Sequence, residues 1–265
     1  MDMIKKLIIR IVCVAFFIPI LLAPQDNSHV STQEQLVISF LNIPDGEATL
    51  IQTSEGENFL INTGSDYSLK SLMKQLQQLH VEDIDQIILT NQSAAYQGNL
   101  KHIVEAFHVK NVITAQKNKD LTQLVDQAKI VKWDANNSYS LSEYLTFYVH
   151  ESSRSGEMTL SISYGENSIL YMGYSEQPTL KELKQQLHHK PDIIKIPDFA
   201  QGNSPSEKLL KEIDPHISII FNVKSGKLNY ALLQRLNESW IEVYQLKKVG
   251  TTVIRMNLKD YQIIS

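Results

Sequence analysis

Apolar residues recur in two alternating patterns from residue 35 to the end of the chain. Short runs rich in β-branched residues predict strands, whereas runs with apolar positions three or four apart predict amphipathic helices. The predicted strands span residues 36–41, 48–52, 59–62, 86–89, 111–115, 145–149, 159–164, 168–172, 192–196, 217–221, 252–257 and 261–264. The predicted helices span residues 68–79, 100–107, 121–128, 179–187, 206–212 and 230–238.

The order of these elements predicts the fold class. Two halves each begin with strands and continue as strand–helix alternation, which is typical of two mixed sheets with helices on their outer faces. No linker rich in Pro, Gly or Ser divides residues 35–265. We therefore expect one α/β domain over residues 35–265, built as a four-layer αββα sandwich.

The first 34 residues have a different pattern. Residues 1–10 carry Lys5, Lys6 and Arg10, and an unbroken apolar run follows at residues 11–24. A basic stretch before an apolar core is typical of an export signal. The run ends in Ala23-Pro24 without a good cleavage site, which favours an uncleaved anchor over a cleaved signal. Residues 1–34 are thus predicted to be a signal or membrane anchor with a short linker, and the protein to be exported or held at the outer face of the cytoplasmic membrane.

Composition and charge narrow the function. The chain is 43% hydrophobic and 20% charged, so it is not intrinsically disordered. Its net charge of −4 argues against direct nucleic-acid binding, which normally requires a basic face. The single cysteine, Cys13, lies in the N-terminal apolar run, so neither an internal disulfide nor a cysteine-based zinc site is available to the domain.

Five segments, in a fixed order, resemble the metallo-β-lactamase superfamily, and most closely its ComEC-like branch, the hydrolase domain of DNA-uptake channel proteins. F-L-N-I-P-D-G-E-A at residues 40–48 stands where the family has a D-V-G-Q-G-D-A-like turn, and L-I-N-T-G at 60–64 stands for L-I-D-T-G. I-D-Q-I-I-L-T at 84–90 matches I-D-x-L-I-L-T. M-G-Y at 172–174 matches the x-G-D strand end, and I-K-I-P-D-F-A at 194–200 matches L-K-V-P-H-H-G-S. The resemblance covers nearly the whole predicted domain.

The departures from the family pattern fall at the metal-ligand positions. The resemblance implies an H-x-H-x-D-H motif at residues 91–96, a bridging Asp, the first His of a late H-H pair, and a supporting Asp. These positions are occupied here by Asn91, Ser93, Ala95 and Tyr96, by Tyr174, by Asp198, and by Asn62.

The chemistry of these replacements argues against a metal centre. The resemblance implies two zinc or manganese ions, and such a site needs imidazoles and carboxylates to hold two dications and acidify a bound water. Asn, Ser, Ala and Tyr offer neutral, weak or absent donors, and Asp198 alone would hold a cation only loosely. We therefore expect no metal cofactor and no catalytic residues.

Three aromatic residues fall at or beside the ligand positions, namely Tyr96, Tyr174 and Phe199. Because unfilled space beneath the loops would be costly, the simpler interpretation is that these rings plug the vestigial site. The alternative interpretation is a remodelled pocket that binds an aromatic or carbohydrate-like group or a partner's side chain.

Other candidate groups have simpler explanations. His188-His189 falls at the end of a predicted helix, where imidazole suits the negative end of the helix dipole. His150 follows a predicted strand and is interpreted as structural. A serine triad built from Ser93 and His150 would lack the nucleophile-elbow context that exposes a catalytic serine.

These observations predict an extracytoplasmic pseudo-hydrolase with a binding or accessory role, whose partner is an unknown protein or small molecule. The membrane is expected as a partner through the N-terminal segment. The alternative is an active ComEC-like hydrolase of the phosphodiesterase or nuclease type that uses unusual ligands. Metal content and phosphodiesterase activity would separate the two hypotheses.

Overall fold

The computed structural model describes residues 35–117, 119–125, 127–176 and 190–264. The predicted signal or anchor at residues 1–34, the predicted helix at 179–187 and the pair His188-His189 lie outside the described residues. Within the described ranges, no helix has both the length and the apolar character needed to cross a bilayer.

The described chain alternates strands and helices in the predicted order. Its strands are β1 (Leu36–Phe40), β2 (Thr49–Thr53), β3 (Asn58–Ile61), β4 (Gln86–Leu89), β5 (Asn111–Thr114), β6 (Lys129–Lys132), β7 (Asn137–Ser140), β8 (Leu145–Ser152), β9 (Met158–Tyr164), β10 (Asn167–Met172), β11 (Ile193–Lys195), β12 (Ile217–Ile220), β13 (Glu242–Gln245), β14 (Thr252–Met256) and β15 (Tyr261–Ile264). Its helices are η1 (Asp66–Ser68), α2 (Leu69–Gln78), α3 (Ala94–Gln97), α4 (Leu100–Ala106), α5 (Lys119–Leu124), η2 (Pro197–Ala200), α7 (Glu207–Ile213), α8 (Tyr230–Glu238) and α9 (Leu246–Val249).

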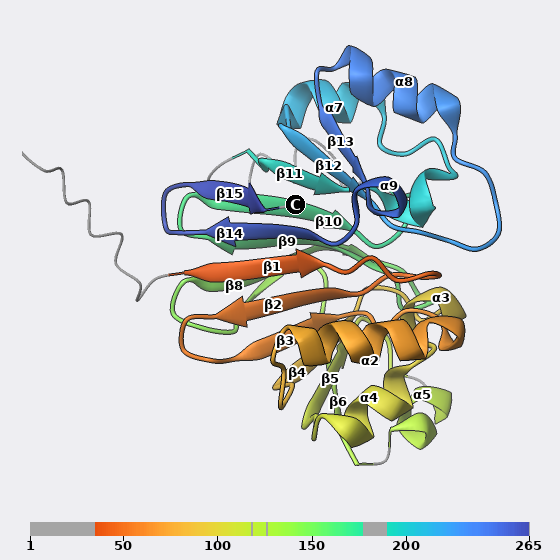
Figure 1. Cartoon of the computed structure of the whole chain (residues 1–265), viewed down its shortest axis with the longest axis vertical. Coiled ribbons are helices and arrows are strands. Elements are labelled where there is room, and N and C mark those ends of the chain that lie inside the picture. Colours follow the sequence, from red (N-terminus) through yellow and green to blue (C-terminus); the bar gives the residue numbers. More distant parts are fainter. Residues whose placement is uncertain (1–34, 118, 126, 177–189, 265) are drawn as a thin grey trace, which may run out of the picture. The chain divides into compact units, whose positions relative to one another are not determined.

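The strands form two mixed sheets. The first has the order β15-β14-β1-β2-β3-β4-β5-β6 and the second the order β13-β12-β11-β10-β9-β8-β7. Each sheet combines antiparallel strands with a parallel part, β3 to β6 in the first and β10 to β13 in the second. In Figure 1, α2 and α4 lie on one side of the two sheets and α7 and α8 on the opposite side. The four-layer αββα prediction is confirmed.

Three apolar cores hold the layers together. The central core lies between the sheets and includes Phe40, Phe147 and Tyr171. A second core joins the first sheet to α2, α4 and α5, and a third joins the second sheet to α7 and α8. Residues 33–265 form one compact unit that contains both sheets and all three cores, so this part has what a chain needs to fold by itself.

Three strands were not predicted from the sequence, and all three lie at sheet edges. β6 ends the first sheet, and β7 and β13 end the second. Their residues are exposed or half-buried, with none fully buried. An edge strand has one covered side at most, so its sequence lacks the apolar run that reveals a central strand.

Candidate functional site

The site predicted from sequence forms where strands of both sheets end. Asn62 follows β3, and Thr90 and Asn91 follow β4, which pairs in parallel with β3. Gly173 follows β10 of the second sheet and lies so close to this edge that a Cβ on it would stand 2.2 Å from the Met158 carbonyl and 2.6 Å from the Thr90 carbonyl. Only glycine permits this approach, so Gly173 sets the distance between the two sheets at the site.

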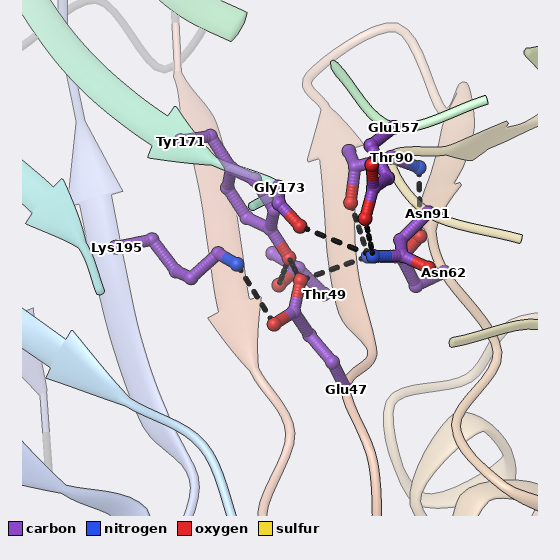
Figure 2. A network of polar contacts seen from close by, with 9 residues as sticks. All are labelled: Glu47, Thr49, Asn62, Thr90, Asn91, Glu157, Tyr171, Gly173 and Lys195. Atoms are coloured by element: carbon purple, nitrogen blue, oxygen red, sulfur yellow. Dashed lines mark hydrogen bonds and ion pairs between the residues drawn. The ribbon is translucent and has the colours of Figure 1, made fainter. Parts of the chain in front are cut away.

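A buried carboxylate, Glu47, lies at the centre of a polar network between the sheets (Figure 2). Its Oε2 accepts a hydrogen bond from Lys195 Nζ at 2.8 Å, and the two side chains form an ion pair. Its Oε1 accepts from Tyr171 Oη at 2.8 Å and from Asn62 Nδ2 at 2.8 Å. Both charged side chains are 0% exposed. The pair is therefore fully removed from water, where a lone charge would be very costly.

The network extends from Glu47 to the first sheet's strand ends. Asn62 Nδ2 also donates to Thr90 Oγ1 at 2.8 Å, and the Thr90 backbone amide donates to Asn62 Oδ1 at 2.9 Å. Tyr171 Oη lies 3.2 Å from Thr49 Oγ1. The Asn62 side chain thus donates to Glu47 and to the Thr90 hydroxyl, and accepts from the Thr90 backbone amide. Both of its donors are used, and one acceptor lone pair is left for a ligand.

Burial controls the protonation chemistry of this network. Desolvation raises the pKa of Glu47, and the ion pair with Lys195 acts in the opposite direction. Desolvation also lowers the pKa of Lys195, against the same attraction. The pKa of Tyr171 is raised well above its usual range by burial and then by the charge of Glu47. The phenol is therefore a proton donor to the carboxylate and not a base.

The residues at the positions where the resemblance implies H-x-H-x-D-H form hydrogen bonds with each other, with backbone groups and with Glu157. Asn91 Nδ2 lies 3.4 Å from both the Gly173 carbonyl and Glu157 Oε1, and its Oδ1 accepts from the Ser93 backbone amide at 2.8 Å. Ser93 is the N-cap residue of α3, and Ala95 belongs to that helix. Asn91 therefore ties the two sheets together, while Ala95 has no polar side-chain atom to offer a metal.

Tyr96 and Phe199 meet across the site, from α3 and η2 respectively. Their ring centroids are 5.5 Å apart at an angle of 42°. Among the described residues, no hydrogen bond of good geometry reaches the buried Tyr96 hydroxyl, although the Asp198 backbone lies close enough to favour its ionised form. Its pKa is raised well above the usual range by burial, and next by the charges of Glu47, Asp198 and Glu157, while the Asp198 backbone acts in the opposite direction. The phenol therefore stays protonated, and this ring contact fills the space between the two loops.

The loop that carries Phe199 has an uncommon backbone. Asp198, Phe199 and Ala200 have φ values of 49°, 55° and 58°, a conformation that L-residues other than Gly rarely adopt in succession. The Asp198 carboxylate accepts a hydrogen bond from the Ser175 hydroxyl. Such backbone costs free energy and persists only where the surroundings fix it. Here it directs Phe199 toward Tyr96.

Tyr174 does not join this ring contact in any described interaction. Its pKa is raised by burial, and next by Glu151, Glu176 and Glu157. The structure thus brings together Asn62, Asn91, Ser93, Ala95, Tyr96, Asp198 and Phe199 around the strand ends, and places Tyr174 beside the acidic residues of the second sheet. His150 is buried, with Nε2 2.6 Å from Ser161 Oγ, so it contacts Ser161 and not Ser93.

Sequence analysis missed the central pair, Glu47 and Lys195. A signal for it was present, because Lys195 interrupts the apolar run I-I-K-I at residues 193–196. A lysine inside a central strand is almost never fully buried without a partner. The partner's identity was not readable, because Glu47 lies 148 residues away in the chain.

The donor set does not fit a pair of divalent cations. Within the described ranges, no three His, Cys, Asp or Glu side chains form a group that could hold a metal ion. The phenol of Tyr96 stays protonated, and Asn91 is occupied by other hydrogen bonds. Asp198 is the only one of the replaced ligand positions that carries a charge.

Comparison with known proteins identifies the fold. No established sequence family and no curated protein matches the chain. Solved structures do match: the metallo-β-lactamase-fold protein YhfI from Bacillus subtilis superposes with a TM-score of 0.61 at 11% identity, over 80% of this chain and 95% of that one. A diphosphatase from the PhnP family gives 0.58 at 11% identity, over 85% and 99% of the two chains. Igni18, a metallo hydrolase from the archaeon Ignicoccus hospitalis, gives 0.58 at 9% identity, over 86% and 99%. The chain therefore has the metallo-β-lactamase fold, and at these identities the likeness concerns the fold alone.

Proposed function

We propose that this protein is a non-hydrolytic member of the metallo-β-lactamase-fold proteins that binds a ligand or partner through the loops over the vestigial site. The observation that carries the proposal is the contact between Tyr96 and Phe199, whose rings occupy the space between the two loops that meet there. A hydrolase of this fold would need that space for its metals and for the substrate's reacting group.

The chemistry of the surrounding groups supports a role without catalysis. The polar side-chain atoms of Asn91 and Asn62 form hydrogen bonds within the protein. Glu47, the one acidic side chain that is buried within the described ranges, forms an ion pair with Lys195 and accepts two further hydrogen bonds. Neither member of this pair is exposed, so neither offers a group to a substrate as acid, base or nucleophile.

The N-terminal sequence pattern supports a location outside the cytoplasm, with the membrane as a partner through residues 1–34. The net charge of −4 weighs against direct binding of a nucleic acid. We therefore propose that the protein is exported or anchored to the outer face of the cytoplasmic membrane. We assign it a protein or small-molecule partner, while a ComEC-like phosphodiesterase activity is the competing hypothesis.

Elemental analysis and a hydrolysis assay test the proposal. We expect the purified full-length chain to carry zinc and manganese far below one ion per chain, because the ligand positions supply a single carboxylate. We also expect no hydrolysis of bis(para-nitrophenyl) phosphate above background, with or without added Mn²⁺ or Zn²⁺. A metallo-β-lactamase-fold phosphodiesterase assayed in parallel shows that the conditions detect this chemistry.

The variant Asp198→Asn is the matched control, since it removes the only charged side chain at the ligand positions without changing its size. Stoichiometric metal that is lost in Asp198→Asn, together with hydrolysis that falls in the same variant, would overturn the proposal in favour of an active hydrolase.

A further inference from the structure

A cavity of about 470 Å³ lies beside Phe199 and is lined by the loop after β12 and by residues of α9. Its buried wall is apolar and consists of Phe199, Ile220 and Phe221. Half-buried Val223 and Leu228 continue that wall toward the surface. This volume is within the range of small-molecule sites, about 300–1,000 Å³, which are mostly apolar with a few placed polar groups.

The rim of the cavity is positively charged. Lys227, Lys247 and Lys248 line it, all three are exposed, and no acidic residue lines it. No ion pair involves these lysines within the described parts of the chain. Three unpaired cations around one opening stand out in a chain whose net charge is −4. Their combined field attracts an anion to this opening.

The cavity is preformed, because contacts within the protein fix its outer loop. Gly226 has φ +107°, and a Cβ on it would stand 2.3 Å from Gln201 Nε2. The same Gln201 Nε2 donates to the Ser225 carbonyl at 3.0 Å. Asn222, at the inner end of the loop, donates to the Ile43 carbonyl at 3.0 Å. A ligand that enters this cavity therefore does not have to order the loop, which favours affinity.

A second cavity of about 500 Å³ lies nearby and provides a contrast. It is lined by residues of α8 and β13, and its lining includes Glu238 as well as Lys248. Because these two charges are opposite, the lining of the second cavity carries no net charge. The second cavity therefore lacks the exclusively basic rim that the cavity beside Phe199 has.

We infer that this cavity binds a small amphiphilic anion, whose apolar body contacts Phe199, Phe221 and Leu228 and whose carboxylate, phosphate or sulfonate lies among Lys227, Lys247 and Lys248. The inference rests on the proposed non-catalytic binding role and gives that role a ligand class. Phe199 connects the two places, since it lines the cavity and also contacts Tyr96. A ligand in the cavity therefore contacts Phe199, which belongs to the loop that closes the vestigial site.

The test compares two fluorescent probes that share an apolar body and differ in charge. Residues 33–265 are titrated with anilinonaphthalene sulfonate, which is anionic, and with N-phenylnaphthylamine, which lacks the sulfonate. We expect saturable binding of the sulfonate at one site, displaced by decyl phosphate or decanoate but by neither inorganic phosphate nor decanol at the same concentration. Raising the ionic strength well above about 0.1 M is expected to weaken sulfonate binding and leave the neutral probe unaffected.

Two variants locate the site. Lys227→Gln/Lys247→Gln/Lys248→Gln is expected to weaken sulfonate binding about tenfold, because exposed charges each contribute modestly, and to leave the neutral probe unchanged. Val223→Trp, which adds bulk to the apolar wall, is expected to weaken both probes. The matched control Lys70→Gln/Lys74→Gln/Lys259→Gln removes three other exposed lysines and is expected to bind like the unaltered protein. Circular dichroism confirms that each variant is folded.

The outcomes are distinct. The anion site is overturned if sulfonate binding is absent or if it is equal in the two triple variants. It is also overturned if neutral decanol displaces the sulfonate probe better than decyl phosphate does. These results leave the proposed non-hydrolytic role intact, because metal content and hydrolysis are measured separately. Metal-dependent hydrolysis would overturn that role, even if the cavity binds the sulfonate as expected.

Discussion

Two buried tyrosines near Glu47 differ in how their hydroxyl groups are satisfied. Tyr171 donates to Glu47 Oε1 at 2.8 Å, whereas the Tyr96 hydroxyl has no well-formed hydrogen bond to any residue that the structure describes. We expect Tyr171→Phe to lower the free energy of unfolding by about 1–3 kcal/mol, because a buried carboxylate loses a donor. Tyr96→Phe is expected to change it by no more than about 0.5 kcal/mol, since only an unsatisfied hydroxyl is removed. Urea denaturation followed by circular dichroism measures both.

Both substitutions remove one oxygen from a buried ring and leave the packing volume almost unchanged, so a difference between their free energies of unfolding reports the hydrogen bond of Tyr171. Equal losses in the two variants would contradict the hydrogen-bond assignment. A large loss in Tyr96→Phe alone would show that its hydroxyl has a bound partner, and would favour a remodelled pocket over a plug.

The same tyrosines predict how stability depends on pH. Burial raises the pKa of both phenols well above 10.0 in the folded state. The folded protein therefore keeps two protons that the unfolded chain releases above pH 10.0, so this part of the stability is fully present below pH 10.0 and is lost as the pH rises toward the folded pKa. Urea midpoints measured from neutral to alkaline pH should fall above about pH 10, and less steeply in Tyr171→Phe. A flat profile would contradict the burial of these phenols.

At the scale of elements, sequence patterns find the buried central strands and miss three edge strands, although they do find the edge strand β15, whose residues are likewise exposed or half-buried. Central strands such as β10 and β12 are buried along their whole length and read as apolar runs. The edge strands β6, β7 and β13 do not, and only pairing with a neighbour defines them. The helices α3 and η2, which hold Ala95, Tyr96, Asp198 and Phe199, are likewise too short to carry a periodic pattern.

The turn before β2 meets α3 at Gly46. Gly46 has φ +96°, and a Cβ on it would stand 2.2 Å from the Ala95 carbonyl and 2.6 Å from the Ser65 backbone nitrogen. Gly56 has a similar φ of +88° but nothing within 4 Å of a Cβ. Gly56→Ala is therefore expected to cost about 1–2 kcal/mol of stability, the cost of left-handed backbone.

Gly46→Ala pays the same backbone cost and in addition pushes two backbone segments apart, for which we expect about 1–3 kcal/mol more. The difference between the two variants in thermal or urea unfolding isolates the contact between the turn and α3. Equal losses would mean that the two loops do not approach as closely as the structure places them.

At the scale of the whole molecule, the fold proved easier to predict than the site. The αββα order follows from the alternation of apolar runs and amphipathic helices, and the chain superposes on metallo-β-lactamase-fold proteins at only 9–11% identity. The sequence resemblance named the loops that converge. It did not reveal the Glu47–Lys195 pair, because that pair joins the turn before β2 of the first sheet to β11 of the second.

The basic cavity beside Phe199 was equally hidden in the sequence. Its lysines come from the loop after β12 and from α9, two segments that no local pattern connects. Read along the chain, Lys227, Lys247 and Lys248 are ordinary surface residues. Only the packing of α9 against the end of the second sheet surrounds a single opening with them.

The sequence by itself determined the layers of this protein and the absence of imidazole and carboxylate groups at Asn91, Ser93, Ala95 and Tyr96, because hydrophobic periodicity and side-chain chemistry are local properties. Only the tertiary structure decided which groups fill the space at the strand ends, and which charges meet. The contacts of Tyr96 with Phe199 and of Glu47 with Lys195 join residues more than a hundred positions apart. Their partners are set by strand order and by the approach of glycine backbones, which no short stretch of sequence specifies.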